Sequence, residues 1–205
     1  MEEFYTVAML LSIVTFTLST VSTPGPNNIM LLSSGLTFGY KRTIPHMFGI
    51  MLGFPFMVLL VGLGLGIVFE KFPIIFTILK IVGILYLFWM AFKIATNKST
   101  LEVKEGEESK PFTFIQSAAF QWVNPKAWIM AITSISIFVT SKDESFAQVV
   151  IIAIIYLLSS IFSTNAWTAG GVVLKRFIKD EKIVRILNIT MAILLVGSVL
   201  PIILE

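Results

Sequence analysis

The residues best suited to chemistry gather where two short polar segments interrupt long apolar stretches. The first segment, residues 23–28, is called the first break here and consists of Thr23, Pro24, Gly25, Pro26, Asn27 and Asn28. Its two prolines remove two backbone donors, so the carbonyl groups one turn earlier lose their helical partners. In a bilayer these carbonyls must be satisfied by protein, water or a bound solute. A helix that restarts after the break would direct its N–H groups back to it, where a carboxylate could bind.

The second break, residues 121–126, follows the same logic with a cation added. It contains Gln121, Asn124, Pro125 and Lys126, and Pro125 suits the first position of a restarted helix. Burying the Lys126 cation would cost at least a few kcal/mol unless it is paired or wetted. Because no carboxylate lies deep in any apolar stretch, a substrate carboxylate is the simplest partner, with water or lipid phosphate as alternatives. The competing interpretations are a lysine that reaches for the headgroups and, at the first break, a plain proline kink.

Polar stripes at helical spacing lead into both breaks. The first stripe is Ser12, Thr15, Ser19 and Ser22/Thr23, and the second is Thr113, Ser117, Gln121 and Asn124. Each stripe could line half of a solute path, or its hydroxyl groups could hold transmembrane helices together. Both interpretations stay open at this point.

Three further residues complete the candidates. Asn165 belongs to the most polar uninterrupted stretch, with Ser159, Ser160, Ser163, Thr164 and Thr168. Lys80 lies roughly 10 Å into its apolar stretch at 1.5 Å per residue, so it could bind solute or reach the outer interface. His46, beside the basic Lys41 and Arg42, is better explained as an interfacial residue than as a proton relay.

Composition decides which elements must position these residues. Of the 205 residues, 56% are hydrophobic and 13% are charged, with a mean hydropathy of +0.91, whereas soluble domains carry about 25% charged residues. A spanning helix needs about 20 mostly apolar residues, and open strands in hydrocarbon would leave backbone groups unpaired. The sequence therefore predicts an all-α integral membrane protein with six transmembrane segments, at residues 4–38, 44–69, 72–95, 111–140, 146–174 and 183–204.

The chain divides into two similar halves. Residues 1–95 and 111–205 flank a polar linker at residues 96–110, and each half opens with a stretch broken at a proline motif, Pro26 or Pro125. Since each half contains three spans, an odd number, the second half must enter the membrane from the opposite side. This is the pattern of inverted-topology repeats in transporters, with two three-helix units.

Basic residues predict the orientation. One set of loops carries Lys41, Arg42, Lys93, Lys98, Lys104, Lys110, Lys175, Arg176, Lys179, Lys182 and Arg185, and the opposite loops carry only Lys71 and Lys142. Lysine and arginine are enriched in cytoplasmic loops, so the linker is expected in the cytoplasm and both termini outside. The first apolar stretch lacks a basic n-region and is interpreted as a retained span.

Absences narrow the function. The chain has no cysteine and one histidine, and we find no nucleotide-binding loop, no nucleophile with a base and no metal-ligand set. No cofactor or metal is expected, and the net charge of +3 reflects topology rather than nucleic-acid binding. The expected partners are a small-molecule substrate and membrane lipid, with a homo-oligomer left open. The remaining alternatives to a transporter are a small-solute channel and an intramembrane enzyme.

Taken together, these motifs resemble the LysE-type (lysine exporter/threonine efflux, LysE/RhtB) family of small exporters. The matching segments are residues 23–28, 35–39, 49–53, 80–87 and 124–127. The resemblance implies secondary efflux of amino acids or their derivatives across the bacterial cytoplasmic (inner) membrane, as an antiporter driven by an ion gradient. Many relatives carry aspartate where this chain has Asn27, which argues against ordinary carboxylate-based proton coupling. The solute would sit between the two breaks, reached from alternate sides as one half rocks against the other.

Overall fold

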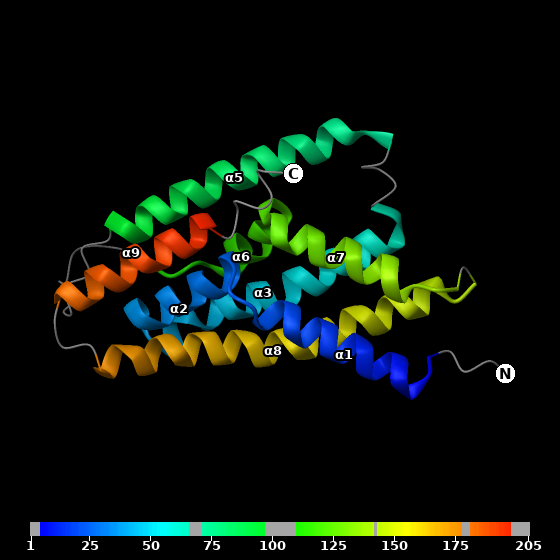
Figure 1. Ribbon diagram of the computed structural model, residues 1–205, viewed down its shortest axis with the longest axis horizontal. Helices are drawn as coiled ribbons and strands as arrows, with labels where there is room; N and C mark the ends of the chain where they lie inside the picture. The colour runs from blue at the N-terminus through cyan, green and yellow to red at the C-terminus, as the bar shows by residue number, and fades with distance from the viewer. Residues whose placement is uncertain (1–4, 66–70, 97–109, 142, 178–180, 198–205) are drawn as a thin grey trace.

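Every regular element that the structure describes is helical. The structure is a computed structural model, and it describes residues 5–65, 71–96, 110–141, 143–177 and 181–197 (Figure 1). The helices are α1 (Val7–Ser22), α2 (Pro26–Phe38), α3 (Tyr40–Leu60), the π turn η1 (Val61–Leu65), α5 (Pro73–Thr96), α6 (Phe114–Phe120), the 3₁₀ turn η2 (Gln121–Val123), α7 (Pro125–Phe138), α8 (Ser145–Phe177) and α9 (Glu181–Gly197). The all-α prediction is confirmed for these residues, whereas the polar linker falls almost wholly outside them.

Three of the described helices are long and apolar enough to cross a membrane: Tyr40–Leu65, Thr77–Thr96 and Ser145–Phe177. Helices α1 and α2 pass the same test together, bent by 55° at the first break, and would make a fourth span. Helices α7 and α9 are shorter, with 14 and 17 residues. Within the described residues the count is therefore three or four, and the arrangement of six spans stays a prediction.

Local sequence explains where the broken helices start. The Thr6 hydroxyl group caps α1 by accepting from the Met9 N–H at 3.2 Å. Helices α2 and α7 both begin at a proline, which has no N–H group to leave unsatisfied there. Asn124 caps α7 by accepting from the Lys126 N–H at 3.2 Å. Thr113 and Gln116 form a reciprocal capping box at the start of α6.

Helix α8 packs along three other helices, α1, α2 and α3 (Figure 1). Its approach to α2 needs glycine on both helices. A Cβ atom at Gly35 would lie 2.3 Å from the Thr168 carbonyl oxygen, and one at Gly171 would lie 2.2 Å from the Leu32 carbonyl oxygen. The polar residues of α8 are consequently held against the first break.

Close contacts of α3 and α5 hold the second break and the helix before it in place. A Cβ atom at Gly49 of α3 would lie 1.8 Å from the Ser117 hydroxyl oxygen of α6, and one at Gly83 of α5 would lie 1.9 Å from the Val123 carbonyl oxygen. Helices α5 and α9 pack on each other and cover this region (Figure 1). Their outer residues are apolar and exposed, for example Ile74, Leu85 and Ile193 at 63%, 63% and 65%, which is the surface expected against lipid.

Exposed basic residues lie toward one end of the long axis. The start of α3, the end of α8 and the start of α9 lie toward one end (Figure 1), with exposed Lys41, Arg42, Lys175 and Arg176. The start of α1 and the end of α7 lie toward the opposite end. This distribution agrees with the basic-residue pattern of the sequence, and the direction of the termini stays a prediction.

The contact between α2 and α8 yields a matched pair of variants. Gly171→Ala should destabilise the protein by about 1–3 kcal/mol, because the new methyl group overpacks a backbone contact. Gly170→Ala is the control, since its Cβ atom would meet only the Leu32 Cδ1 atom at 3.6 Å, and alanine favours the helix by about 0.5–1 kcal/mol. The thermal unfolding midpoint of the detergent-solubilised protein measures both. Equal midpoints would show that the two helices are not packed as described.

Candidate functional site

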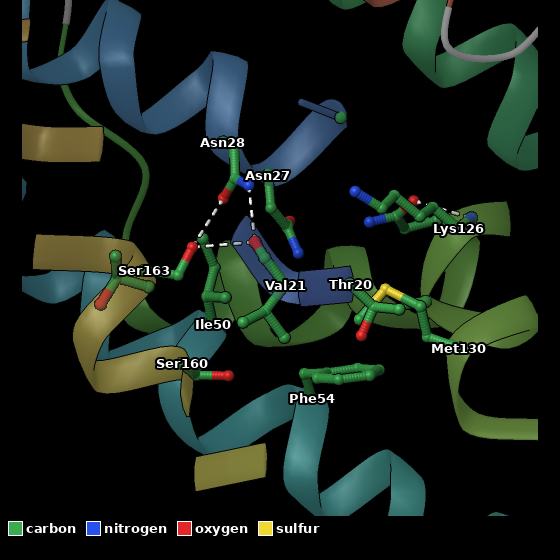
Figure 2. A pocket seen from close by; sticks show the side chains of 14 residues that line it. Thr20, Val21, Asn27, Asn28, Ile50, Phe54, Lys126, Met130, Ser160 and Ser163 are labelled. Carbon is green, nitrogen blue, oxygen red and sulfur yellow. Dashed lines mark hydrogen bonds between the residues drawn. The ribbon is translucent and has the colours of Figure 1, made fainter. Parts of the chain in front are cut away.

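A small central cavity lies between the two breaks (Figure 2). Its volume is about 40 Å³, and since one water needs about 10–15 Å³, it holds only a few waters in this conformation and must widen to admit a larger solute. Its lining comes from the end of α1, both breaks, α3, α7 and α8: Thr20, Val21, Gly25, Asn27, Asn28, Ile50, Phe54, Asn124, Lys126, Ala127, Met130, Ser160, Ser163 and Thr164. The sequence-predicted residues Gly25, Asn27, Asn28, Asn124 and Lys126 thus share one cavity, although the structure does not show that they bind a substrate.

The backbone carbonyl groups freed at the end of α1 are capped by side chains. Asn28, buried at the start of α2, folds back and donates through Nδ2 to the Val21 and Thr23 carbonyl oxygens at 2.7 and 2.8 Å. The first break is therefore closed by an amide that lies within it.

Helix α8 also caps carbonyl groups at the end of α1: that of Val21, which Asn28 already caps, and that of Ser22. The Ser163 hydroxyl group donates to the Val21 carbonyl oxygen at 2.8 Å, and the Trp167 indole N–H donates to the Ser22 carbonyl oxygen at 3.2 Å. Figure 2 shows Asn28 and Ser163 beside Val21. The second half of the chain thus completes the backbone pairing of the first.

Lys126 supplies the remaining cap. Its Nζ atom donates to the Thr23 carbonyl oxygen at 2.9 Å, to the Thr23 hydroxyl oxygen at 2.8 Å and to the Pro24 carbonyl oxygen at 3.3 Å. These three bonds use all three N–H donors of the ammonium group. They lie at the C-terminal end of α1, which carries a partial negative charge. The sequence suggested a substrate carboxylate, water or lipid phosphate as the partner of Lys126, and the structure adds backbone carbonyl and hydroxyl oxygens of the first break.

Gly25 makes the Lys126 contact possible. A Cβ atom there would lie 2.8 Å from the Lys126 Cδ atom and 3.0 Å from Nζ, so a larger residue would displace the lysine side chain. The φ angle of Gly25 is 179°, an extended conformation open to any residue. Glycine is needed here for space rather than for backbone conformation.

A reciprocal amide pair joins the two breaks directly. Asn27 Nδ2 donates to Gln121 Oε1 at 2.8 Å, and Gln121 Nε2 donates to Asn27 Oδ1 at 3.1 Å. Gln121 is fully buried and also donates to the Ser117 carbonyl oxygen at 2.9 Å. It does not line the cavity, so its visible role is to hold Asn27 in place.

The two polar stripes have different surroundings. In the first, Ser12, Thr15 and Ser19 are exposed. In the second, Ser117, Gln121 and Asn124 are buried. Three of the four residues of the second stripe are therefore enclosed by the protein, whereas the first stripe lies at an open surface.

The remaining predicted candidates are not among the described residues that line the cavity. Asn165 accepts from the Tyr40 hydroxyl group and donates to the Ile161 carbonyl oxygen, which links α8 to the start of α3. Lys80 lies in α5, and its side chain is outside the described part of the structure. The prolines of both breaks shape the backbone and are absent from the cavity lining, as is Thr23.

His46 differs from the expected interfacial residue. It is 1% exposed and faces Phe112, with ring centroids 5.3 Å apart. Neither ring nitrogen has a hydrogen-bond partner in the structure. It packs between α3 and the segment before α6 and does not line the cavity.

Sequence reasoning missed the cavity walls contributed by intact helices. Ser160, Ser163 and Thr164 had a signal, since they belong to the most polar uninterrupted stretch. Phe54 and Met130 had none, because an apolar wall residue in a membrane protein looks like any other core residue. Among the described residues no group of three or more potential metal ligands occurs.

Comparisons with known proteins agree with the motifs. The model of the LysE type translocator family matches residues 18–203. Proteins named cysteine/O-acetylserine efflux protein from Escherichia coli strain K12 and from Shigella sonnei strain Ss046 are each 33% identical to this chain over 194 residues, covering 93% of this chain and 95% of the relative. The protein of the same name from Escherichia coli strain E24377A is 32% identical over the same length. No solved structure matches the chain.

The amide pair can be tested with a double-mutant cycle. Asn27→Leu and Gln121→Leu should each destabilise the protein by about 1–3 kcal/mol, because each leaves the other amide without its partner. The double variant should lose less than the sum, by about 0.5–3 kcal/mol, as expected for residues in contact. Thermal unfolding in detergent provides the measurement.

The control for this cycle combines Asn27→Leu with Gln148→Leu. Gln148 is also a buried glutamine, but its partners are Thr140 and Ser141. The effects of this combination should simply add. Additivity in the Asn27 and Gln121 pair as well would show that the two breaks are not joined through these amides.

Proposed function

Because this chain belongs to the family of LysE type translocators, we propose that it exports small neutral amino acids or their O-acylated derivatives through the cavity between its two breaks. The chain is a transporter, not an enzyme. The names of its relatives, cysteine/O-acetylserine efflux protein, indicate the size and charge of solute proposed here. The observation that carries the proposal is the Lys126 ammonium group resting on carbonyl groups of the first break beside the cavity.

This arrangement suits a zwitterion. An α-amino acid brings an ammonium group and a carboxylate, and the site already holds an ammonium group against carbonyl oxygens. On binding, the substrate ammonium replaces Lys126 at the Thr23 and Pro24 carbonyl groups, and the freed Lys126 meets the substrate carboxylate. The net charge of the cavity is the same before and after, so the exchange avoids an unpaired buried charge.

The lining also selects the substrate side chain. Among the described residues that line the cavity, Lys126 is the only ionisable one. A cationic side chain would find no carboxylate there, and its burial would be costly. The hydroxyl groups of Ser160, Ser163 and Thr164 can bond a hydroxyl, thiol or ester, while Phe54 and Met130 accept apolar atoms. We therefore infer a preference for neutral side chains.

The capping bonds suggest how the site opens. Lys126, Gln121, Ser163 and Trp167 belong to the second half, and their partners belong to the first. If the halves are inverted three-span repeats in the bacterial cytoplasmic membrane, with both termini outside, rocking one against the other breaks and remakes these bonds. We propose secondary transport of this kind, driven by an ion gradient.

The test measures export directly. Cells that overproduce the chain should accumulate more O-acetylserine, cysteine or serine in the medium than cells with an empty vector, and no more lysine. Lys126→Met should weaken substrate binding by about 1–3 kcal/mol, or roughly 5- to 150-fold, because a charged hydrogen bond is lost. Lys126→Arg should restore only part of it, since its planar fork fits a different geometry.

Ile129→Met is the matched control, because this exposed residue on the same helix does not line the cavity. It should export like the parent. Lys126→Met with parental export at equal protein level would contradict the proposed site. Equal export of lysine would contradict the proposed selectivity.

A further inference from the structure

A second, wider depression lies on the surface between α1 and α7. Its volume is about 640 Å³, far larger than the central cavity. Along α1 it is lined by the hydroxyl residues Ser12, Thr15, Ser19 and Thr20 and by the apolar Leu11 and Phe16, and along α7 by Ile137 and Phe138. We call it the α1–α7 groove.

The groove meets the central cavity at one residue. Thr20 lines both, and its hydroxyl group is bonded to the Phe16 and Thr17 carbonyl oxygens at 2.8 and 3.1 Å. The Thr20 side chain is therefore held within its own helix and does not bridge to α7. A solute in the cavity and a solute in the groove would contact the same side chain, that of Thr20.

The groove side of α1 carries four hydroxyl residues beside the apolar Leu11 and Phe16, whereas the neighbouring face is apolar. Ser12 and Thr15 donate to the Ala8 and Leu11 carbonyl oxygens at 2.9 and 2.8 Å, so their lone pairs remain to accept from water or from an ammonium group. Val14 and Leu18, on the adjacent face, are 42% and 37% exposed and do not line the groove. Hydroxyl groups at this position are suited to wetting a passage.

The packing of α1 against α7 is less close than the packing of α2 against α8 on the opposite side of the cavity. It has an edge-to-face contact of Phe16 and Phe138, with centroids 5.5 Å apart, and a 2.7 Å bond from the Tyr5 hydroxyl group to the Phe138 carbonyl oxygen. On the other side, α2 and α8 touch backbone to backbone at Gly35 and Gly171. The α1–α7 side is thus the easier one to open.

The groove extends toward the end of the molecule opposite the basic residues. The start of α1 and the end of α7 lie there, away from the start of α3 and the end of α8 (Figure 1). By the basic-residue pattern this end faces outward. We propose that the α1–α7 groove is the release route by which an exported amino acid leaves the central cavity, with Thr20 at the junction. This inference rests on the proposed function.

Single-cysteine labelling tests the route, because the native chain has no cysteine. In intact cells, a charged, membrane-impermeant methanethiosulfonate reagent should modify Ser19→Cys at least about tenfold faster than Leu18→Cys, since the reactive thiolate forms in water and not in an apolar surround. Leu18 is the matched control, because it lies only about 1.5 Å from Ser19 along the helix axis. Thr15→Cys and Val14→Cys form a second pair, should one variant of the first fail to fold.

Modification should also block export. The labelled Ser19→Cys protein should lose at least about nine-tenths of its export, because the adduct fills the passage, and labelled Leu18→Cys should retain it. Equal labelling rates within both pairs, or full export after complete labelling of Ser19→Cys, would overturn the route. Export by the unlabelled variants reports on the proposed function separately: if the parent chain exports no amino acid, that function fails whatever the labelling shows.

Discussion

The structure depends on the need to pair the backbone carbonyl groups freed where α1 stops inside an apolar body. Water satisfies such groups at the surface of a soluble protein, whereas in a bilayer the protein must supply the donors. Here they come from Asn28, Ser163, Trp167 and Lys126. These donors lie on α2, α8 and α7, so pairing one helix end fixes the relative positions of elements from both halves of the chain.

The same constraint creates a site that can change its partners. A buried lysine that caps carbonyl groups is stable while its ammonium group is bonded to them. When another cation takes its place on the carbonyl oxygens, the lysine can leave without a change in the net charge beside them. An amino acid carries such a cation together with a carboxylate for the released lysine. In this account, substrate binding loosens the cap that joins the halves, which couples recognition to movement without any acidic residue in the cavity. Gly25 permits it, because a side chain there would occupy the path of the lysine stem.

The sequence could predict features that depend on residues close together along the chain. It could not predict contacts between residues that are far apart in sequence. The break between α1 and α2 and the start of α7 at Pro125 follow from proline chemistry within a few residues. The partner of Lys126 lies 103 residues away, and no local rule points to a carbonyl group as the counterpart of a cation. Both polar stripes have helical spacing, yet Ser12, Thr15 and Ser19 of the first are exposed and Ser117, Gln121 and Asn124 of the second are buried. The neighbours that decide this difference belong to other helices. Phe54 and Met130 could not be distinguished from other apolar residues, since cavity walls and packed cores use the same side chains.

The most direct test is an experimental structure of the full chain with O-acetylserine or serine bound. A substrate carboxylate oxygen should lie about 2.7–3.2 Å from the Lys126 Nζ atom. The substrate ammonium group should bind the Thr23 and Pro24 carbonyl oxygens that Lys126 occupies when no substrate is bound. A bound amino acid elsewhere, with Lys126 still on both carbonyl groups, would contradict the exchange and leave the lysine as a fixed part of the scaffold.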